Sequence, residues 1–71
     1  MFAVMKFKVL EAKNEGLNFK IEENLPEVGA YLYIFENGKC THDYLQDTVE
    51  KCKEFAYEDF GVPVNAWKEV V

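Results

Sequence analysis

Residues 43–60 read DYLQDTVEKCKEFAYEDF, and this pattern predicts one long amphipathic helix around which the rest of the chain is arranged. At about 100° per residue, one side of that helix collects mostly apolar residues: Leu45, Thr48, Val49, Cys52, Phe55, Ala56 and Phe60. Asp43, with Gln46 three residues later, predicts a capping box that satisfies free backbone N–H groups. Gly61 and Pro63 predict the end of the helix, because glycine adopts the left-handed conformation and proline cannot continue a helix.

The opposite side of the predicted helix is acidic. Asp43, Asp47, Glu50, Glu54 and Glu58 fall within roughly 60–80° of arc. Like charges four residues apart destabilise a helix by about a few tenths of a kcal/mol per pair, so the acidic side slightly destabilises the predicted helix. Such a face indicates a binding surface for a basic partner. We expect four of these residues to form it: Asp47, Glu50, Glu54 and Glu58. The alternative is a solvated face that keeps a small acidic protein in solution.

Alternation of apolar and polar residues predicts two strands near the N-terminus, over residues 3–9 and 17–21. The first would direct Ala3, Met5, Phe7 and Val9 to one face, and the second Leu17, Phe19 and Ile21. Asn14-Glu15-Gly16 has the chemistry of a hairpin turn between them. Pro26 and Gly29 mark a loop over residues 23–29.

Residues 30–36 (AYLYIFE) have apolar or aromatic side chains at both odd and even positions up to Phe35, which is typical of a strand covered on both faces. Tyr31, Tyr33 and Phe35 point to one face, and Leu32 and Ile34 point to the other. One helix covers one face of a sheet, so something else must cover the second: the C-terminal tail, a second copy of the chain, or a ligand. The pattern leaves open which of the two faces meets the helix.

Asn37-Gly38 is a strong hairpin signal, since both central positions of a type I′ turn need positive φ. The turn predicts a short fourth strand that leads directly into the helix. The expected register pairs Glu36 with Lys39, Phe35 with Cys40, Ile34 with Thr41 and Tyr33 with His42.

These elements predict a single α+β domain over residues 1–71. It is an antiparallel β-meander of three to four strands with one long amphipathic helix packed on one face, in ββββα order, and a short C-terminal tail. The tail, residues 62–71, fits either a single turn of helix or another strand, and Trp67 is expected to anchor it to the body.

Composition narrows the classes of function. The chain has 13 acidic residues, eight lysines and no arginine, for a net charge of −5, and 49% of its residues are hydrophobic, which is too apolar for a disordered segment. Lack of arginine and net acidity both argue against nucleic-acid binding. No secretory signal or membrane-spanning run is recognisable, so we expect a cytoplasmic protein without a membrane partner.

The residues that could act in catalysis or metal binding form neither a complete catalytic set nor a complete ligand set. Cys40 and His42 are expected to share a strand face, but a structural zinc site needs four ligands, so we expect neither a metal nor a cofactor. As a nucleophile–base pair they lack an oxyanion loop and an orienting group, so no enzymatic activity is expected. Pairing of Cys40 with Cys52 in a disulfide stays open.

Three functions remain. The leading hypothesis is a non-enzymatic interaction module whose acidic helix face binds a basic partner, as inhibitor- and immunity-type proteins do. The second is a structural homodimer that closes through the sheet. The third is a single-stranded nucleic-acid binder: Tyr31, Tyr33 and Phe35 would stack bases if they face outward with Lys6, Lys8 and Lys20, and would otherwise be core or interface.

Overall fold

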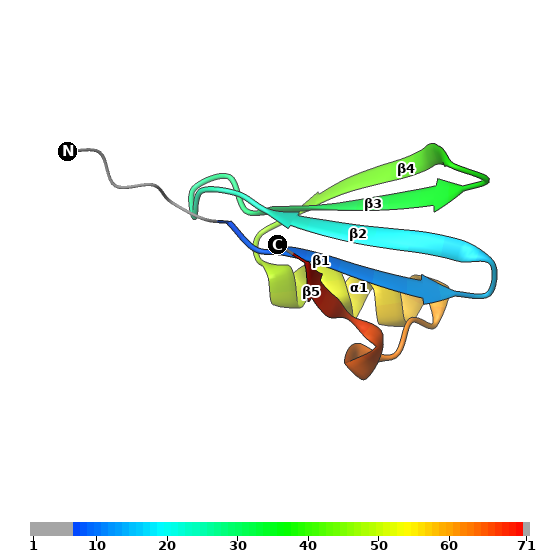
Figure 1. The fold of residues 1–71 in the computed structure, drawn as a ribbon. Coiled ribbons are helices and arrows are strands. Elements are labelled where there is room, and N and C mark those ends of the chain that lie inside the picture. The colour runs from blue at the N-terminus through cyan, green and yellow to red at the C-terminus, as the bar shows by residue number, and fades with distance from the viewer. Residues whose placement is uncertain (1–6, 71) are drawn as a thin grey trace.

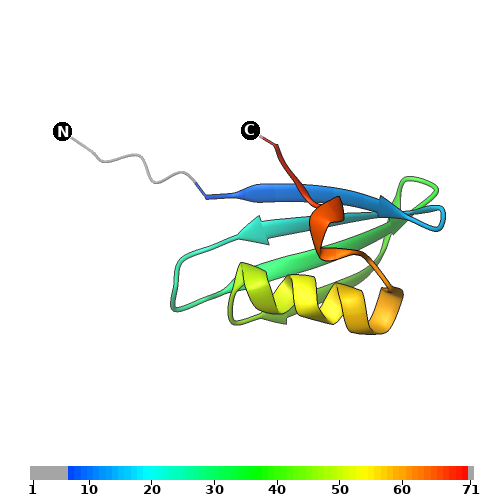
Figure 2. The ribbon, with the colours of Figure 1, turned by 90° about the horizontal axis from the view of Figure 1, so that it is seen from below.

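A computed structural model describes residues 7–70 and shows one antiparallel sheet with a helix across one of its faces (Figure 1 and Figure 2). Over these residues the sheet has five strands in the order β4-β3-β2-β1-β5. The elements are β1 (Val9–Asn14), β2 (Leu17–Glu23), β3 (Ala30–Glu36), β4 (Lys39–Gln46), α1 (Val49–Phe60), the 3-10 turn η1 (Val64–Ala66) and β5 (Lys68–Val70). The α+β class is confirmed. The predicted strand count was too low, because the tail adds an edge strand.

Both two-residue hairpin turns form where the sequence predicted them. Glu15 and Gly16 have φ of 50° and 80°, and Asn37 and Gly38 have φ of 52° and 79°. Positive φ at both central positions is the type I′ geometry, whose twist matches that of the flanking strands. The two turns therefore determine how β1 pairs with β2 and how β3 pairs with β4.

A β-bulge in β4 changes the predicted register. Phe35 lies opposite Cys40 as expected, but Ile34 lies opposite His42 and Tyr33 opposite Asp43, with Thr41 as the extra residue. Because a one-residue slip moves every later side chain to the other face, the predicted pairs of Ile34 with Thr41 and of Tyr33 with His42 were wrong.

The helix begins six residues later than predicted. Residues 43–46 belong to β4, and Thr48 is the N-cap, with its Oγ1 accepting the Lys51 N–H at 3.1 Å. The predicted capping role of Asp43 is wrong, because pairing with β3 holds this segment extended until the chain leaves the sheet edge. The predicted end is confirmed: Gly61 adopts the left-handed conformation, and its N–H bonds back to the last turn.

Within the described residues, the first strand begins at Val9, later than predicted. Residues 3–6 lie outside the described residues, and Leu10 and Ala12 are the buried side chains of β1, whereas Phe7 is exposed. The Glu15-Gly16 turn pairs Leu10 with Ile21 and Ala12 with Phe19, so the even-numbered residues of β1 join the core.

The core lies between the sheet and α1. It contains the side chains that the strands direct toward the helix, with residues from the helix and the tail: Leu10, Ala12, Phe19, Ile21, Ala30, Leu32, Ile34, Cys52, Ala56, Val62 and Trp67. The tail forms both of its predicted alternatives, a 3-10 turn and then a strand beside β1. Trp67 is 9% exposed and its ring meets that of Phe19 edge-on, with centroids 6.4 Å apart, so its role as an anchor is confirmed.

Candidate interaction surface

Strand β3 presents its aromatic residues away from the helix. Ala30, Leu32 and Ile34 are fully buried against α1, while Tyr31, Tyr33 and Phe35 are half-buried on the opposite side. The rings of Tyr31 and Tyr33 stack with centroids 6.0 Å apart, and those of Tyr33 and Phe35 are 6.5 Å apart. The face that meets the helix, which the sequence left open, is therefore the aliphatic one.

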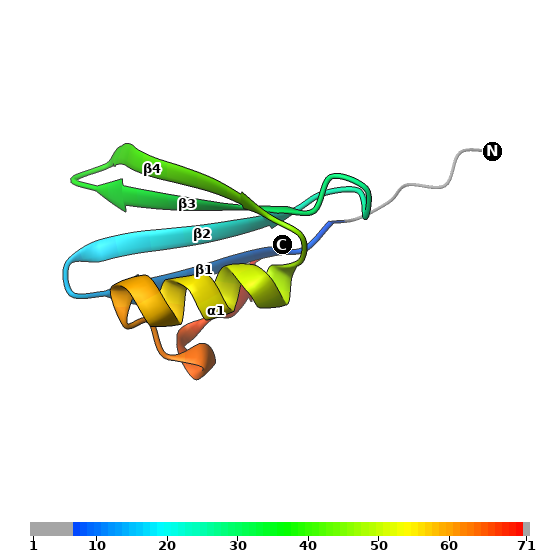
Figure 3. The ribbon, with the colours of Figure 1, turned by 180° about the vertical axis from the view of Figure 1, so that it is seen from behind.

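No segment of residues 7–70 lies over the aromatic side of the sheet (Figure 1 and Figure 3). Helix α1, η1 and the anchor Trp67 are all on the other side. The tail, one of the three predicted covers for this side, thus packs elsewhere. We call the side chains that the strands turn away from α1 the outer face: Val9, Glu11, Lys13, Asn18, Lys20, Glu22, Tyr31, Tyr33, Phe35, Cys40, Asp43, Leu45, Lys68 and Val70.

Charged residues flank the aromatic row in equal numbers. Three are basic and three are acidic: Lys13, Lys20 and Lys68, with Glu11, Glu22 and Asp43. Lys20 Nζ lies 2.9 Å from Glu22 Oε2, and this hydrogen bond raises the pKa of Lys20. Although the chain carries −5, the outer face is therefore neutral.

Tyr33 occupies the centre of the row. It lies opposite Lys20 on one neighbouring strand and Asp43 on the other. Partial burial raises the pKa of Tyr33, and the nearby carboxylates of Glu22 and Asp43 raise it further. Its hydroxyl stays protonated in neutral solution and is available as a hydrogen-bond donor to a partner.

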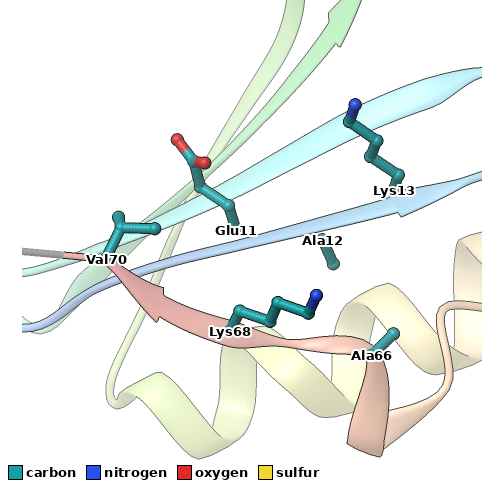
Figure 4. Close-up of a pocket in the computed structure, with 6 residues that line it drawn as sticks. All are labelled: Glu11, Ala12, Lys13, Ala66, Lys68 and Val70. Atoms are coloured by element: carbon teal, nitrogen blue, oxygen red, sulfur yellow. The ribbon is translucent and has the colours of Figure 1, made fainter.

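One edge of the outer face is notched where β5 separates from β1 (Figure 4). The notch has a volume of about 420 Å³ and is lined by Glu11, Ala12, Lys13, Ala66, Lys68 and Val70. Figure 4 shows Glu11, Lys13 and Val70 on the outer side and Ala12 turned toward α1. These side chains include neither a nucleophile–base pair nor a set of metal ligands. The notch is therefore a recess in the surface without the residues of a catalytic or metal site.

The predicted acidic residues of the helix are all exposed. Asp47 precedes the N-cap, and Glu50, Glu54 and Glu58 follow one another at four-residue spacing along α1. Lys51 Nζ lies 3.8 Å from Glu54 Oε1, and both side chains are well exposed. Asp43 was predicted to belong to this set, but it lies in β4.

Cys40 and His42 lie on opposite sides of the sheet. The bulge leaves Cys40 on the outer face, whereas His42 turns toward the helix side, where its ring stacks on Tyr44, with centroids 6.0 Å apart. The expectation that Cys40 and His42 share a face was wrong. Within residues 7–70, no three His, Cys, Asp or Glu side chains converge as metal ligands.

Both thiols are free. Cys40 is exposed, while Cys52 is fully buried and donates from Sγ to the Ala30 carbonyl at 3.5 Å. Burial raises the pKa of Cys52 to about 11. Because one thiol lies on the outer face and the other lies beneath the opposite side of the sheet, they are not paired.

Among the members of the outer face that sequence reasoning missed, Asp43 and Leu45 were assigned to the helix. Leu45 lies opposite Tyr31 and is 54% exposed, so it extends the apolar area onto β4. Thr48 was the available signal: a Thr followed by an apolar residue is also an N-cap candidate, and it would have placed both residues before the helix.

Comparison with protein-family models, with curated proteins and with solved structures finds no significant match to this chain. In the part of the chain that the structure describes, no helix has the length and apolar character needed to cross a membrane.

Proposed function

We propose that this protein is a non-enzymatic protein-interaction module whose contact surface is the outer face of the sheet. One observation supports this most directly: Tyr31, Tyr33 and Phe35 form a row of neighbouring rings on a face that no segment of residues 7–70 covers. Contiguous exposed apolar patches are typical of interaction sites, and aromatic residues are enriched at the centres of interfaces. The proposed setting is the cytoplasm, where the free thiols of Cys40 and Cys52 stay reduced.

Affinity purification with the tagged full-length chain tests this proposal. Wild-type protein is compared with a Tyr31→Ser, Tyr33→Ser double variant and with Tyr57→Ser, a matched control because Tyr57 lies on the helix and is 58% exposed. We expect the associated protein, whether foreign or an untagged copy of the chain, to be retained by the control and lost from the double variant. Equal recovery with all three proteins would overturn the proposal.

The acidic helix face, formed by Asp47, Glu50, Glu54 and Glu58, is the second candidate, for a basic partner. Its four carboxylates are exposed, and Lys51 lies within ion-pair distance of one of them. Complementary charge speeds association more than it adds affinity, so an inhibitor- or immunity-like role would appear in the association rate.

Charge reversal tests the helix face. Glu50→Lys combined with Glu54→Lys is expected to slow association with a basic partner strongly without lowering the melting temperature, because both side chains are exposed. An unchanged association rate would mean that the carboxylates form only a solvated face.

Binding of single-stranded nucleic acid ranks third. The tyrosine row does face outward, as such binding requires, but Glu22 and Asp43 lie beside Tyr33 and repel phosphate. We expect no binding of a fluorescent oligonucleotide at low salt. Binding that weakens with salt and is lost in Tyr33→Ala would reverse this ranking.

A further inference from the structure

The outer face has the charge pattern of a surface that binds its own copy. Its three lysines and three carboxylates sum to zero, and the remaining residues carry the whole −5. A strongly basic partner would be drawn to the helix side instead. Two outer faces, by contrast, meet without net repulsion, and a twofold axis that runs along β3 through Tyr33 places Lys20 of each copy opposite Asp43 of the other.

The size of the face also fits a second copy. Neighbouring strands lie about 4.8 Å apart, and each residue extends a strand by about 3.3 Å. Four strands of about seven residues therefore cover roughly 450 Å². Two copies together would bury roughly 900 Å² before β5 and the relief of the side chains are counted, which is near the roughly 1,000 Å² of a weak specific interface. We therefore expect a dimer that dissociates in the micromolar range rather than an obligate one.

We propose that the outer face of one copy packs on the outer face of a second, with Tyr33 near the twofold axis; this rests on the proposed function of that face. Twisted sheets that pack face to face lie about 10 Å apart, with their strands rotated by roughly 30°. The dimer is then a four-layer α/β/β/α sandwich. Its core adds Leu45 and Val9 around the aromatic rows, and both α1 helices lie outside.

This arrangement leaves the acidic helix face free. Glu50, Glu54 and Glu58 lie on the side of α1 away from the sheet, so a dimer carries two such surfaces pointing in opposite directions. Self-association and binding of a basic partner are therefore compatible.

Sedimentation velocity of the full-length chain, from about 1 µM to about 1 mM, brackets the dissociation constant of such an interface. We expect a monomer–dimer equilibrium whose dissociation constant rises about tenfold or more in Tyr33→Asp, as for a central interface residue, and stays unchanged in Tyr57→Asp. The melting temperature of each variant, measured at low concentration, separates loss of pairing from loss of folding. If Tyr33→Asp fails to fold, the milder Tyr33→Ser replaces it.

Cys40 provides a second readout in the unmodified protein. It is exposed and lies opposite Phe35 on the outer face, so its reaction with a maleimide should slow as the chain concentration rises. The reference is Tyr33→Asp, in which the rate should not depend on concentration.

Three results would overturn the proposal: a monomer at about 1 mM, a dimer that Tyr33→Asp leaves intact, or slow Cys40 labelling in a monomer, which would mean that the chain covers its own outer face. The affinity purification distinguishes this failure from failure of the proposed function. If the protein is a monomer but the Tyr31→Ser, Tyr33→Ser variant loses a foreign partner, the outer face is still an interaction surface. Only the proposal that a second copy binds there is then wrong.

Discussion

At the scale of the residue, the two cysteines of this chain are chemically different because of where they lie. Cys40 is exposed at the open hairpin end of the sheet, whereas Cys52 is enclosed between α1 and β3 and donates to a backbone carbonyl. Transfer of a thiolate into an apolar environment is unfavourable, so burial keeps Cys52 protonated. The pKa of Cys52 rises from 9.0 to about 11, and this links it to stability in alkaline solution.

We expect the free energy of unfolding to fall as the pH rises from about 9 to about 11. In this range the unfolded chain releases the Cys52 proton while the folded chain retains it, so each rise in pH favours unfolding. The shift from 9.0 to about 11 corresponds to a loss of about 3 kcal/mol at most. Urea denaturation across this range measures the loss.

Cys52→Ala is the control for that measurement, since lysines and tyrosines also titrate in this range. The substitution lowers stability at every pH, but the part of the pH dependence that belongs to the thiol should disappear. Identical slopes in the two proteins would show that Cys52 is not the linked group.

At the scale of the element, the start of α1 illustrates a competition between capping and pairing. Asp43 and Thr48 are both good N-cap residues by type. Asp43 lies in a segment that pairs with β3 through its whole length, and only beyond Gln46 is the backbone free to turn. Thr48 then caps the helix through its contact with the Lys51 N–H.

Substitution of the two candidate caps should therefore give different results. Thr48→Ala is expected to cost about 1 kcal/mol, because a backbone N–H loses its partner. Asp43→Ala on the exposed face of β4 should change the free energy of unfolding by less than about 0.5 kcal/mol. Chemical denaturation with α-helical circular dichroism measures both; a larger loss in Asp43→Ala would contradict the observed boundary.

Two glycines in loops give a second contrast between elements. Gly29 has φ of 108°, and a Cβ there would collide with the Gln46 carbonyl at the end of β4. Gly16 also has positive φ, but a Cβ there would meet open space. The first glycine therefore permits close approach of two chain segments, while the second only permits a turn.

We expect Gly16→Ala to cost about 1 kcal/mol for the left-handed conformation alone. Gly29→Ala should cost at least about 2 kcal/mol more, because the ends of β3 and β4 must also move apart. Melting temperatures of the two variants decide this. Equal losses would mean that the junction between the loop and β4 adapts without strain.

At the scale of the whole molecule, charge is distributed between two sides. The outer face is neutral, while the rest of the chain carries the −5. In a dimer through the outer face, the two negatively charged bodies repel each other at a distance, and salt screens that repulsion.

Self-association should therefore be unchanged or slightly tighter when salt rises from about 0.05 M to about 0.5 M, a range over which the screening length shortens severalfold. Binding of a basic partner to the helix face should weaken over the same range. Sedimentation equilibrium at the two salt concentrations measures the first effect. A dimer that dissociates in high salt would indicate that ion pairs, rather than the aromatic row, hold it together.

Much of this fold could be predicted because some signals are local. The Asn37-Gly38 turn, strand 30–36 and the end of the helix at Gly61 all formed where the residues indicated. A glycine at positive φ or a run of β-formers acts through its own backbone and near neighbours. The candidate surface was predictable only in part: Tyr31, Tyr33 and Phe35 were identified, but their direction was not.

Local residue patterns were thus enough to specify the two turns, the doubly apolar central strand, the helix stop and the acidity of the chain. Packing in three dimensions was needed to specify the bulge at Thr41, the late start of α1, the pairing of the tail with β1 and the outward direction of the aromatic row. The physical reason is that these features result from contacts between segments distant in sequence. Whether Leu32 or Tyr33 faces α1 depends on how all five strands and the helix pack together.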